Sequence, residues 1–96
     1  MPTFAALIEF TDDEALRQAT RPRHREYLRS LLEAGKLRLS GPWADDTGAL
    51  IVYETADAAE AQAILDADPY RAAGVIANAT IKGWTIVLEA ERGSSR

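Results

Sequence analysis

The sequence contains no cysteine and a single histidine. Without cysteine the chain cannot form disulfide bonds, thiolate metal sites or a cysteine nucleophile, and one histidine alone argues against a zinc site. We therefore expect no bound metal. At 96 residues there is room for one domain, which would bury only about 60 to 65% of the surface that its unfolded chain exposes. Burying so little surface leaves a small stability margin, which small domains offset with disulfides, metals or a partner subunit. For this chain, association with a partner subunit is the remaining possibility.

Positive charge and long apolar runs are also scarce. Fifteen acidic residues against eleven basic ones give a net charge of −4, which argues against nucleic acid as a partner. The five arginines between residues 17 and 29 have acidic residues near them, so the sequence predicts no basic stripe. No run approaches the roughly 20 apolar residues that span a bilayer, and the N-terminus lacks a secretory signal. We expect no membrane partner and a cytoplasmic location.

The first half of the chain predicts a strand followed by a helix. The run from Phe4 to Phe10 is apolar on both faces, which is typical of a central strand covered on two sides. Thr11 and Glu14 have the spacing of a capping box and predict a short helical piece. A stronger helix is expected over residues 22–34, with Pro22 at its first position. Its apolar stripe is His24, Tyr27, Leu28, Leu31 and Leu32, and Gly35 ends it as a left-handed cap.

A hairpin and a second helix follow. Strands are expected over residues 36–40 and 49–54, joined by a turn at 45–48, with Gly41-Pro42 interrupting the first of them. A helix is expected to begin at Asp57 and to stop at Asp68-Pro69. Asp68 before Pro69 also has the pattern of an N-cap that opens a short turn.

The last strand is expected over residues 75–88, with a bulge at Gly83. Residues 1–90 then form a single domain, and residues 91–96 form a flexible tail. The order β-α-β-β-α-β predicts an α+β, ferredoxin-like fold with a four-stranded antiparallel sheet and both helices on one face. The strands carry apolar residues on the other face too, and soluble monomers rarely expose so large an apolar patch. We therefore expect a homodimer that packs two such faces together; the alternative is that small alanines make the face tolerable in water.

His24 and Asp68 are the candidate residues for proton transfer. His24 is the side chain whose ordinary pKa lies nearest neutrality, and it opens an apolar stripe where partial burial could tune it. Asp68 ends the second helix, so the two side chains can meet and the carboxylate can orient the imidazole as a general base. The alternatives are a structural histidine and an aspartate that serves as a cap. Asp68 could cap a helix and orient His24 at the same time, since a carboxylate has two oxygens.

Three further residues are candidates for substrate binding. Ser40 could donate to a substrate oxygen, and Trp43 could supply an apolar wall beside the Gly41-Pro42 bend. Arg21 lies one turn before His24 and could bind a substrate carboxylate through two hydrogen bonds. The alternatives are a bulged hairpin with a partly covered tryptophan and a solvated arginine.

Several short motifs, taken in order, closely resemble the YciI-like (YCII-related) family over about residues 4 to 88. They are Arg21-Pro22-Arg23-His24, Gly35-Lys36-Leu37, Ser40-Gly41-Pro42, Gly48, Asp66-Ala67-Asp68-Pro69-Tyr70 and Ala73-Gly74. The resemblance implies a ferredoxin-like fold that dimerises through its sheets into a dimeric α/β barrel. It also implies an active site on a His–Asp pair, which corresponds to His24 and Asp68, with Ser40 beside it. The segment between Trp43 and Ala49 is shorter than in many members, so pocket contacts from that loop are not carried over.

The resemblance further implies small cofactor-free enzymes that act on products of aromatic-ring breakdown, including removal of chloride from a chlorinated hydroxyquinol. The wider superfamily includes muconolactone isomerases and small monooxygenases. The function expected from the sequence is therefore a cofactor-independent lyase or isomerase that uses His24 and Asp68 on a small-molecule substrate. A non-catalytic ligand-binding or regulatory dimer and a purely structural interaction domain are the alternatives.

Overall fold

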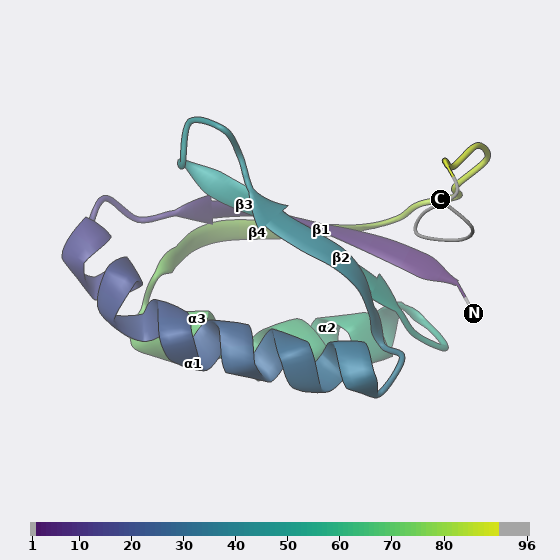
Figure 1. Cartoon of the computed structure of the whole chain (residues 1–96), viewed down its shortest axis with the longest axis horizontal. Coiled ribbons are helices and arrows are strands. Elements are labelled where there is room, and N and C mark those ends of the chain that lie inside the picture. Colours follow the sequence, from purple (N-terminus) through teal and green to yellow (C-terminus); the bar gives the residue numbers. More distant parts are fainter. Residues whose placement is uncertain (1, 91–96) are drawn as a thin grey trace.

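A computed structural model describes residues 2–90, so the tail expected at 91–96 lies outside the described residues. A four-stranded antiparallel sheet forms one layer and three helices cover one of its faces (Figure 1). The elements are β1 (Thr3–Phe10), α1 (Glu14–Glu33), β2 (Leu37–Pro42), β3 (Gly48–Glu54), α2 (Ala58–Asp66), α3 (Pro69–Ala73) and β4 (Ile76–Gly83). This order confirms the predicted α+β fold and adds a short third helix.

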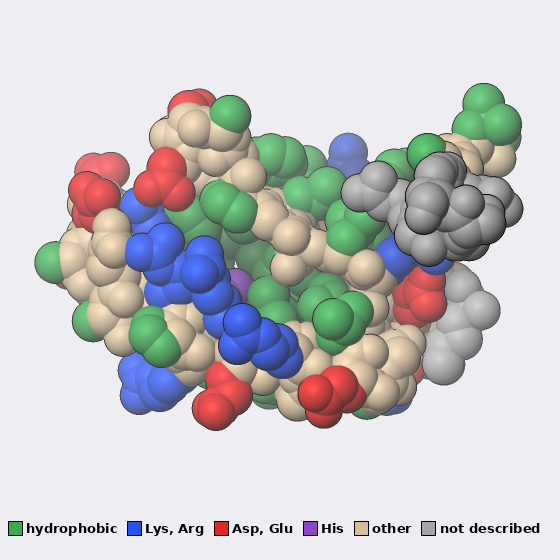
Figure 2. Space-filling view, in the orientation of Figure 1, with side chains coloured by type: hydrophobic (Ala, Val, Ile, Leu, Met, Phe, Trp, Pro, Cys, Tyr) green, Lys and Arg blue, Asp and Glu red, His purple; other side chains and the backbone are tan. Residues whose placement is uncertain are grey.

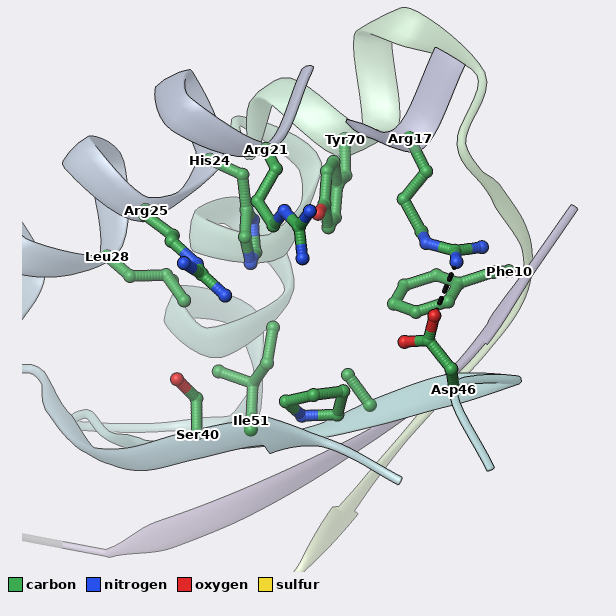
Figure 3. Close-up of a pocket in the computed structure, with 13 residues that line it drawn as sticks. Phe10, Arg17, Arg21, His24, Arg25, Leu28, Ser40, Asp46, Ile51 and Tyr70 are labelled. Atoms are coloured by element: carbon green, nitrogen blue, oxygen red, sulfur yellow. Dashed lines mark hydrogen bonds and ion pairs between the residues drawn. The ribbon is translucent and has the colours of Figure 1, made fainter. Parts of the chain in front are cut away.

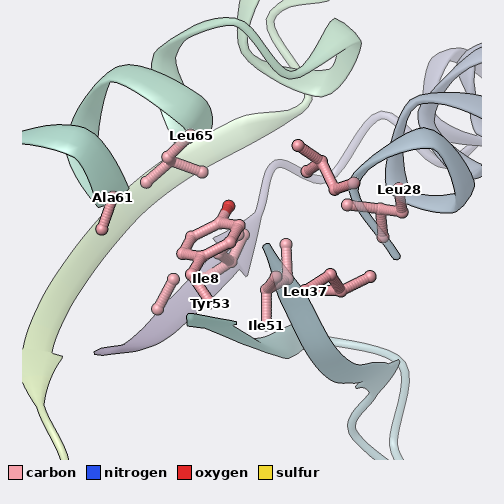
Figure 4. Packing of buried hydrophobic residues seen from close by; sticks show 9 residues of the cluster. Ile8, Leu28, Leu37, Ile51, Tyr53, Ala61 and Leu65 are labelled. Carbon is pink, nitrogen blue, oxygen red and sulfur yellow. The ribbon is translucent and has the colours of Figure 1, made fainter. Parts of the chain in front are cut away.

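The sheet has the strand order β2-β3-β1-β4, so β1 is central as predicted. Alternate residues of β1 point toward the helices, and there Ala6 and Ile8 are buried. They join Ile51 and Tyr53 of β3 in the main core (Figure 4). Leu28 of α1 and the α2 residues Ala61 and Leu65 cover this cluster from the helical layer.

Helix α1 is continuous across Pro22, which corrects the prediction of a helix that begins there. Its N-cap is Asp13, whose side chain accepts a hydrogen bond from Leu16 N at 3.0 Å, so the predicted Thr11 capping box is wrong. The helical piece predicted near Thr11 and Glu14 is present as the first turns of α1. The buried face of the helix runs through Thr20, His24, Leu28 and Leu31, on both sides of the proline. The stability gained by packing this face against the sheet outweighs the cost of the backbone hydrogen bond that Pro22 cannot donate. Figure 1 shows the first turns of α1 at an angle to the rest, as a proline inside a helix produces.

Two strand boundaries also differ from the predictions. Strand β2 runs through Gly41 and Pro42 because it lies at an edge of the sheet, where a proline need not donate to a neighbour. Strand β4 ends at Gly83, which pairs regularly with Phe4 and forms no bulge. The register of the β1–β4 pair shifts instead opposite Glu9 and Phe10, where Ala77 of β4 is the extra residue. Residues 84–90 are therefore not part of the strand predicted to reach residue 88.

Tyr53 is fully buried, and its hydroxyl has no hydrogen-bond partner among residues 2–90. Burial raises the pKa of this phenol, and the negative charge of Asp68 adds to the effect. Above about pH 10 the unfolded chain releases this proton while the folded chain keeps it, so folding stability falls as the pH rises.

We predict that Tyr53→Phe removes this alkaline loss. The free energy of unfolding, measured in urea, should fall by about 1 kcal/mol more for the wild type than for the variant between pH 9 and pH 11. Near neutral pH the variant should be at least as stable, because a buried hydroxyl without a partner is lost. Equal changes with pH in the two proteins would contradict the prediction.

Candidate active site

Asp68 lies at the junction of α2 and α3 and is 1% exposed. Its backbone is extended, and its Oδ1 accepts a hydrogen bond from the backbone N–H of Tyr70 at 2.9 Å. Pro69 occupies the first turn of α3, where its missing N–H costs nothing. The predicted cap is therefore confirmed, and it fixes the carboxylate in the interior.

His24 of α1 forms a hydrogen bond with this carboxylate. Its Nδ1 lies 2.8 Å from Asp68 Oδ1, and the two residues are 44 positions apart in the sequence. The predicted pair is thus present. An ionised carboxylate only accepts hydrogen bonds, so a neutral imidazole bonded to it through Nδ1 has its proton on Nδ1 and its lone pair on Nε2. One oxygen of Asp68 serves both His24 and the α3 cap, while Oδ2 has no partner among the described residues.

Two aromatic rings hold the imidazole in place. The ring of Tyr70 stacks on that of His24, with centroids 3.9 Å apart and planes 6° apart. Phe10 then meets Tyr70 edge-on, at 5.8 Å and 81°. Burial raises the pKa of the Tyr70 phenol, and the positive charges of nearby arginines oppose that rise. Tyr70 is not among the site residues predicted from the sequence, although it directly follows the Asp68-Pro69 pair.

A cavity of about 160 Å³ opens between α1 and the edge strand β2, with His24 in its wall (Figure 3). Ser40 lines the opposite wall on β2, and Arg21 lines the helical wall, so two of the predicted binding residues share this cavity with the histidine. The remaining lining residues are Phe10, Arg17, Arg25, Leu28, Gly41, Pro42, Asp46, Ala49, Ile51 and Tyr70.

Trp43, the third predicted binding residue, does not line this cavity. It is 38% exposed at the start of the β2–β3 loop and packs against Gly48. A Cβ atom at Gly48 would lie 2.9 Å from Trp43 Nε1 and 2.0 Å from the carbonyl oxygen of Ile8, so only glycine fits there. Trp43 therefore belongs to the packing of the loop, and Phe10, Pro42 and Ile51 supply apolar surface to the cavity instead.

Arginines of α1 form a basic row along the cavity, contrary to the expectation that no basic stripe exists. Arg17, Arg21 and Arg25 all line it. Figure 2 shows blue side chains along α1 beside the hollow in which the histidine is visible. Their four-residue spacing is visible in the sequence, but it indicates one face only if a single helix spans residues 17–25. The predicted break at Pro22 concealed it.

The family model of the YCII-related domain matches residues 3–85, which is most of the chain. The chain belongs to the YCII-related family. The fold agrees with the fold expected from the resemblance to this family, because it is a ferredoxin-like α+β fold with a four-stranded antiparallel sheet.

One solved structure similar to this YCII-related domain is 5-chloro-2-hydroxyhydroquinone dehydrochlorinase (TftG) from Burkholderia phenoliruptrix AC1100, in complex with 2,5-dihydroxybenzoquinone. The TM-score is 0.75 at 22% sequence identity, and the match covers 86% of this chain and 93% of the other. At this identity the likeness shows a shared fold. None of the curated proteins compared with the chain matches it.

Residues 2–90 contain no group of three or more His, Cys, Asp or Glu side chains that could hold a metal ion. Within the same residues, no helix is long and apolar enough to cross a membrane.

We predict that Asp68→Ala destabilises the domain by about 2 to 4 kcal/mol. The change removes the α3 cap, worth about 1 kcal/mol, and leaves the buried Nδ1–H of His24 unpaired, which costs about 1 to 3 kcal/mol. Urea unfolding measures both effects together. Asp68→Asn keeps an oxygen that accepts both hydrogen bonds and should cost less.

Asp57→Ala is the matched control, because Asp57 caps α2 through Glu60 N at 2.9 Å and touches no histidine. It should cost about 1 kcal/mol. Equal losses for the two alanine variants would mean that the His24–Asp68 hydrogen bond contributes nothing to stability.

Proposed function

We propose that this YCII-related protein is a cofactor-independent lyase or isomerase that moves a proton on a small carbonyl or aromatic-derived compound. One observation carries the proposal: Asp68 holds Nδ1 of His24, and the ring lines a cavity open to solvent. An imidazole held in this way has its other nitrogen free to act as a base on a bound molecule.

In the proposed reaction, His24 Nε2 takes a proton from a hydroxyl group or from a carbon next to a carbonyl. The electron pair left behind moves into the conjugated system and makes its oxygen negative. In a lyase this pair then forms a new double bond to a neighbouring saturated carbon, whose bond to a leaving group such as chloride breaks; the chloride departs with the electrons of that bond, and the proton stays on His24. In an isomerase the imidazolium returns the proton to another carbon of the same system. Asp68 is the positioning residue, since its carboxylate stabilises the imidazolium between the two steps.

Ser40 is the proposed donor to the developing oxyanion. It lies on β2, across the cavity from the α1 wall that carries His24 (Figure 3). A hydroxyl aimed at the atom that gains charge stabilises the transition state more than the bound substrate. Arg21, on the same wall as His24, is proposed to bind the substrate as well.

The size of the cavity supports a ligand with one ring. An apolar cavity of about 150 Å³ holds a benzene molecule, and the cavity beside His24 has about 160 Å³. The similar structure TftG is a dehydrochlorinase in complex with a benzoquinone. Hydroxylated and chlorinated aromatic rings and small lactones are therefore the first substrates to test.

We predict that His24→Gln lowers turnover of any substrate found in such a panel by about 10²- to 10⁴-fold, because the general base is lost. The fold should survive, since the helix keeps Leu28 and Leu31 in the core. Glu26→Gln, an exposed change on the same helix, is the control and should keep full activity. Ligand binding without turnover across the panel would contradict the enzyme and favour the regulatory or ligand-binding dimer.

We also propose that the chain forms a homodimer through the sheet face opposite the helices. Leu7 of β1 is 38% exposed there and Leu39 of β2 is 49% exposed. Trp84 pairs with Thr3 just beyond β4 and adds a half-exposed indole to the same face. Val87 and Leu88 extend this apolar surface and are 82% and 92% exposed. A second copy of the same face would cover these side chains with two-fold symmetry.

We predict about twice the chain mass in light scattering of the eluted protein at micromolar concentration. The double variant Leu7→Glu, Leu39→Glu should elute as a folded monomer, because dimerisation would bury both added charges in the proposed interface. Leu32→Glu adds charge at an exposed leucine of α1 and should remain a dimer. A wild-type monomer at this concentration would refute the proposal.

A further inference from the structure

Three arginines of α1 stand one above another along the cavity. Arg17, Arg21 and Arg25 follow at intervals of four residues, so the continuous helix places them on one face. Like charges at this spacing repel one another and destabilise a helix. The whole chain has a net charge of −4, so the row does not reflect a basic composition. A negative charge close to the row would offset the repulsion among the three guanidinium groups.

The protein supplies that counter-charge to only one of the three within the described residues. Arg17 pairs with Asp46 of the β2–β3 loop at 2.7 Å, and its guanidinium lies 4.8 Å from the centre of the Phe10 ring. Arg21 donates to the neutral amide of Gln18 at 2.6 Å. Across residues 2–90, no carboxylate lies within ion-pair distance of Arg21 or Arg25.

Both unpaired guanidinium groups belong to the cavity. Figure 3 shows the side chains of Arg21 and Arg25 on either side of His24. The electrostatics agree, because the positive charges of all three arginines oppose the rise in the pKa of Tyr70. The carboxylate bonded to His24, that of Asp68, is buried, does not line the cavity and forms no ion pair with an arginine of the row.

We infer that the cavity binds a single-ring organic anion whose carboxylate is held by Arg21 and Arg25. This inference rests on the proposed function and names its substrate class. A guanidinium donates two parallel hydrogen bonds to a carboxylate, so two of them fix its position. The ring then lies between His24 and the apolar wall of Pro42 and Ile51. Arg17, already neutralised by Asp46, closes the far end of the cavity.

The test compares two probes with the same ring, 2,5-dihydroxybenzoate and the neutral 2,5-dihydroxybenzamide, by calorimetric titration of the full chain. The wild type should bind the benzoate at least ten-fold more tightly. Arg21→Gln and Arg25→Gln should each weaken benzoate binding about ten-fold or more and leave benzamide binding unchanged, because charge-assisted hydrogen bonds are lost.

Arg23→Gln is the matched control, because it removes the same charge from an exposed position of α1 that does not line the cavity. It should leave both affinities unchanged. Equal binding of the two probes, no binding of either at millimolar concentration, or an equal loss in Arg23→Gln would overturn the inference. Competition by inorganic phosphate as strong as by the benzoate would also overturn it, since the ring would then contribute nothing.

His24→Gln separates this inference from the proposed function. The variant should lose turnover and keep its preference for the benzoate over the benzamide. If turnover is found but the preference is absent, the enzyme stands and the anion site does not. If the preference is found and no compound is turned over, the anion site stands and the enzyme does not.

Discussion

The hydrogen bond between His24 and Asp68 joins α1 to the start of α3 and places the imidazole in the wall of the cavity. The oxygen that accepts it also caps α3, so the position of the imidazole and the start of that helix depend on the same atom. Tyr70, whose backbone N–H makes the capping bond, also stacks its ring on the imidazole. The local geometry of a five-residue helix is thereby transmitted to a side chain 44 positions away.

The arrangement is costly for so small a domain. Asp68 and His24 are both buried, and burying a carboxylate is unfavourable unless hydrogen bonds replace its water. Two N–H groups do so at Oδ1, but Oδ2 is left without a partner within residues 2–90. A leucine or methionine pair would fill the same space without this penalty. The place of this polar pair at the wall of an open cavity, beside arginines without a carboxylate partner, supports our proposal that the pair acts on a bound molecule.

The sequence determined most of the fold and the central pair, because these follow from local patterns. Alternation and turn residues located the strands, Gly35 ended α1 with a positive φ of 77°, and Asp57 capped α2. His24 and Asp68 could be paired because each lies on an apolar stripe that faces the same sheet. The basic row could not be predicted once the helix was divided at Pro22. Continuity there depends on tertiary packing of Thr20 and Leu28 on either side of the proline, which no local rule reveals. The same holds for Tyr70, whose ring packs on the distant residues His24 and Phe10. Trp43 instead packs within its own hairpin, against Gly48.

The most direct test of the account is the tautomer of the imidazole. His24 is the only histidine in the chain, so its two ring nitrogens give ¹⁵N NMR signals without ambiguity. At a pH where the ring is neutral, we expect Nδ1 to carry the proton and Nε2 to lack it, because an ionised Asp68 can only accept a hydrogen bond. Ligand added to the cavity should then shift the Nε2 signal most. A ring protonated at Nε2, or a mixture of both tautomers, would contradict the claim that Asp68 prepares His24 as a base.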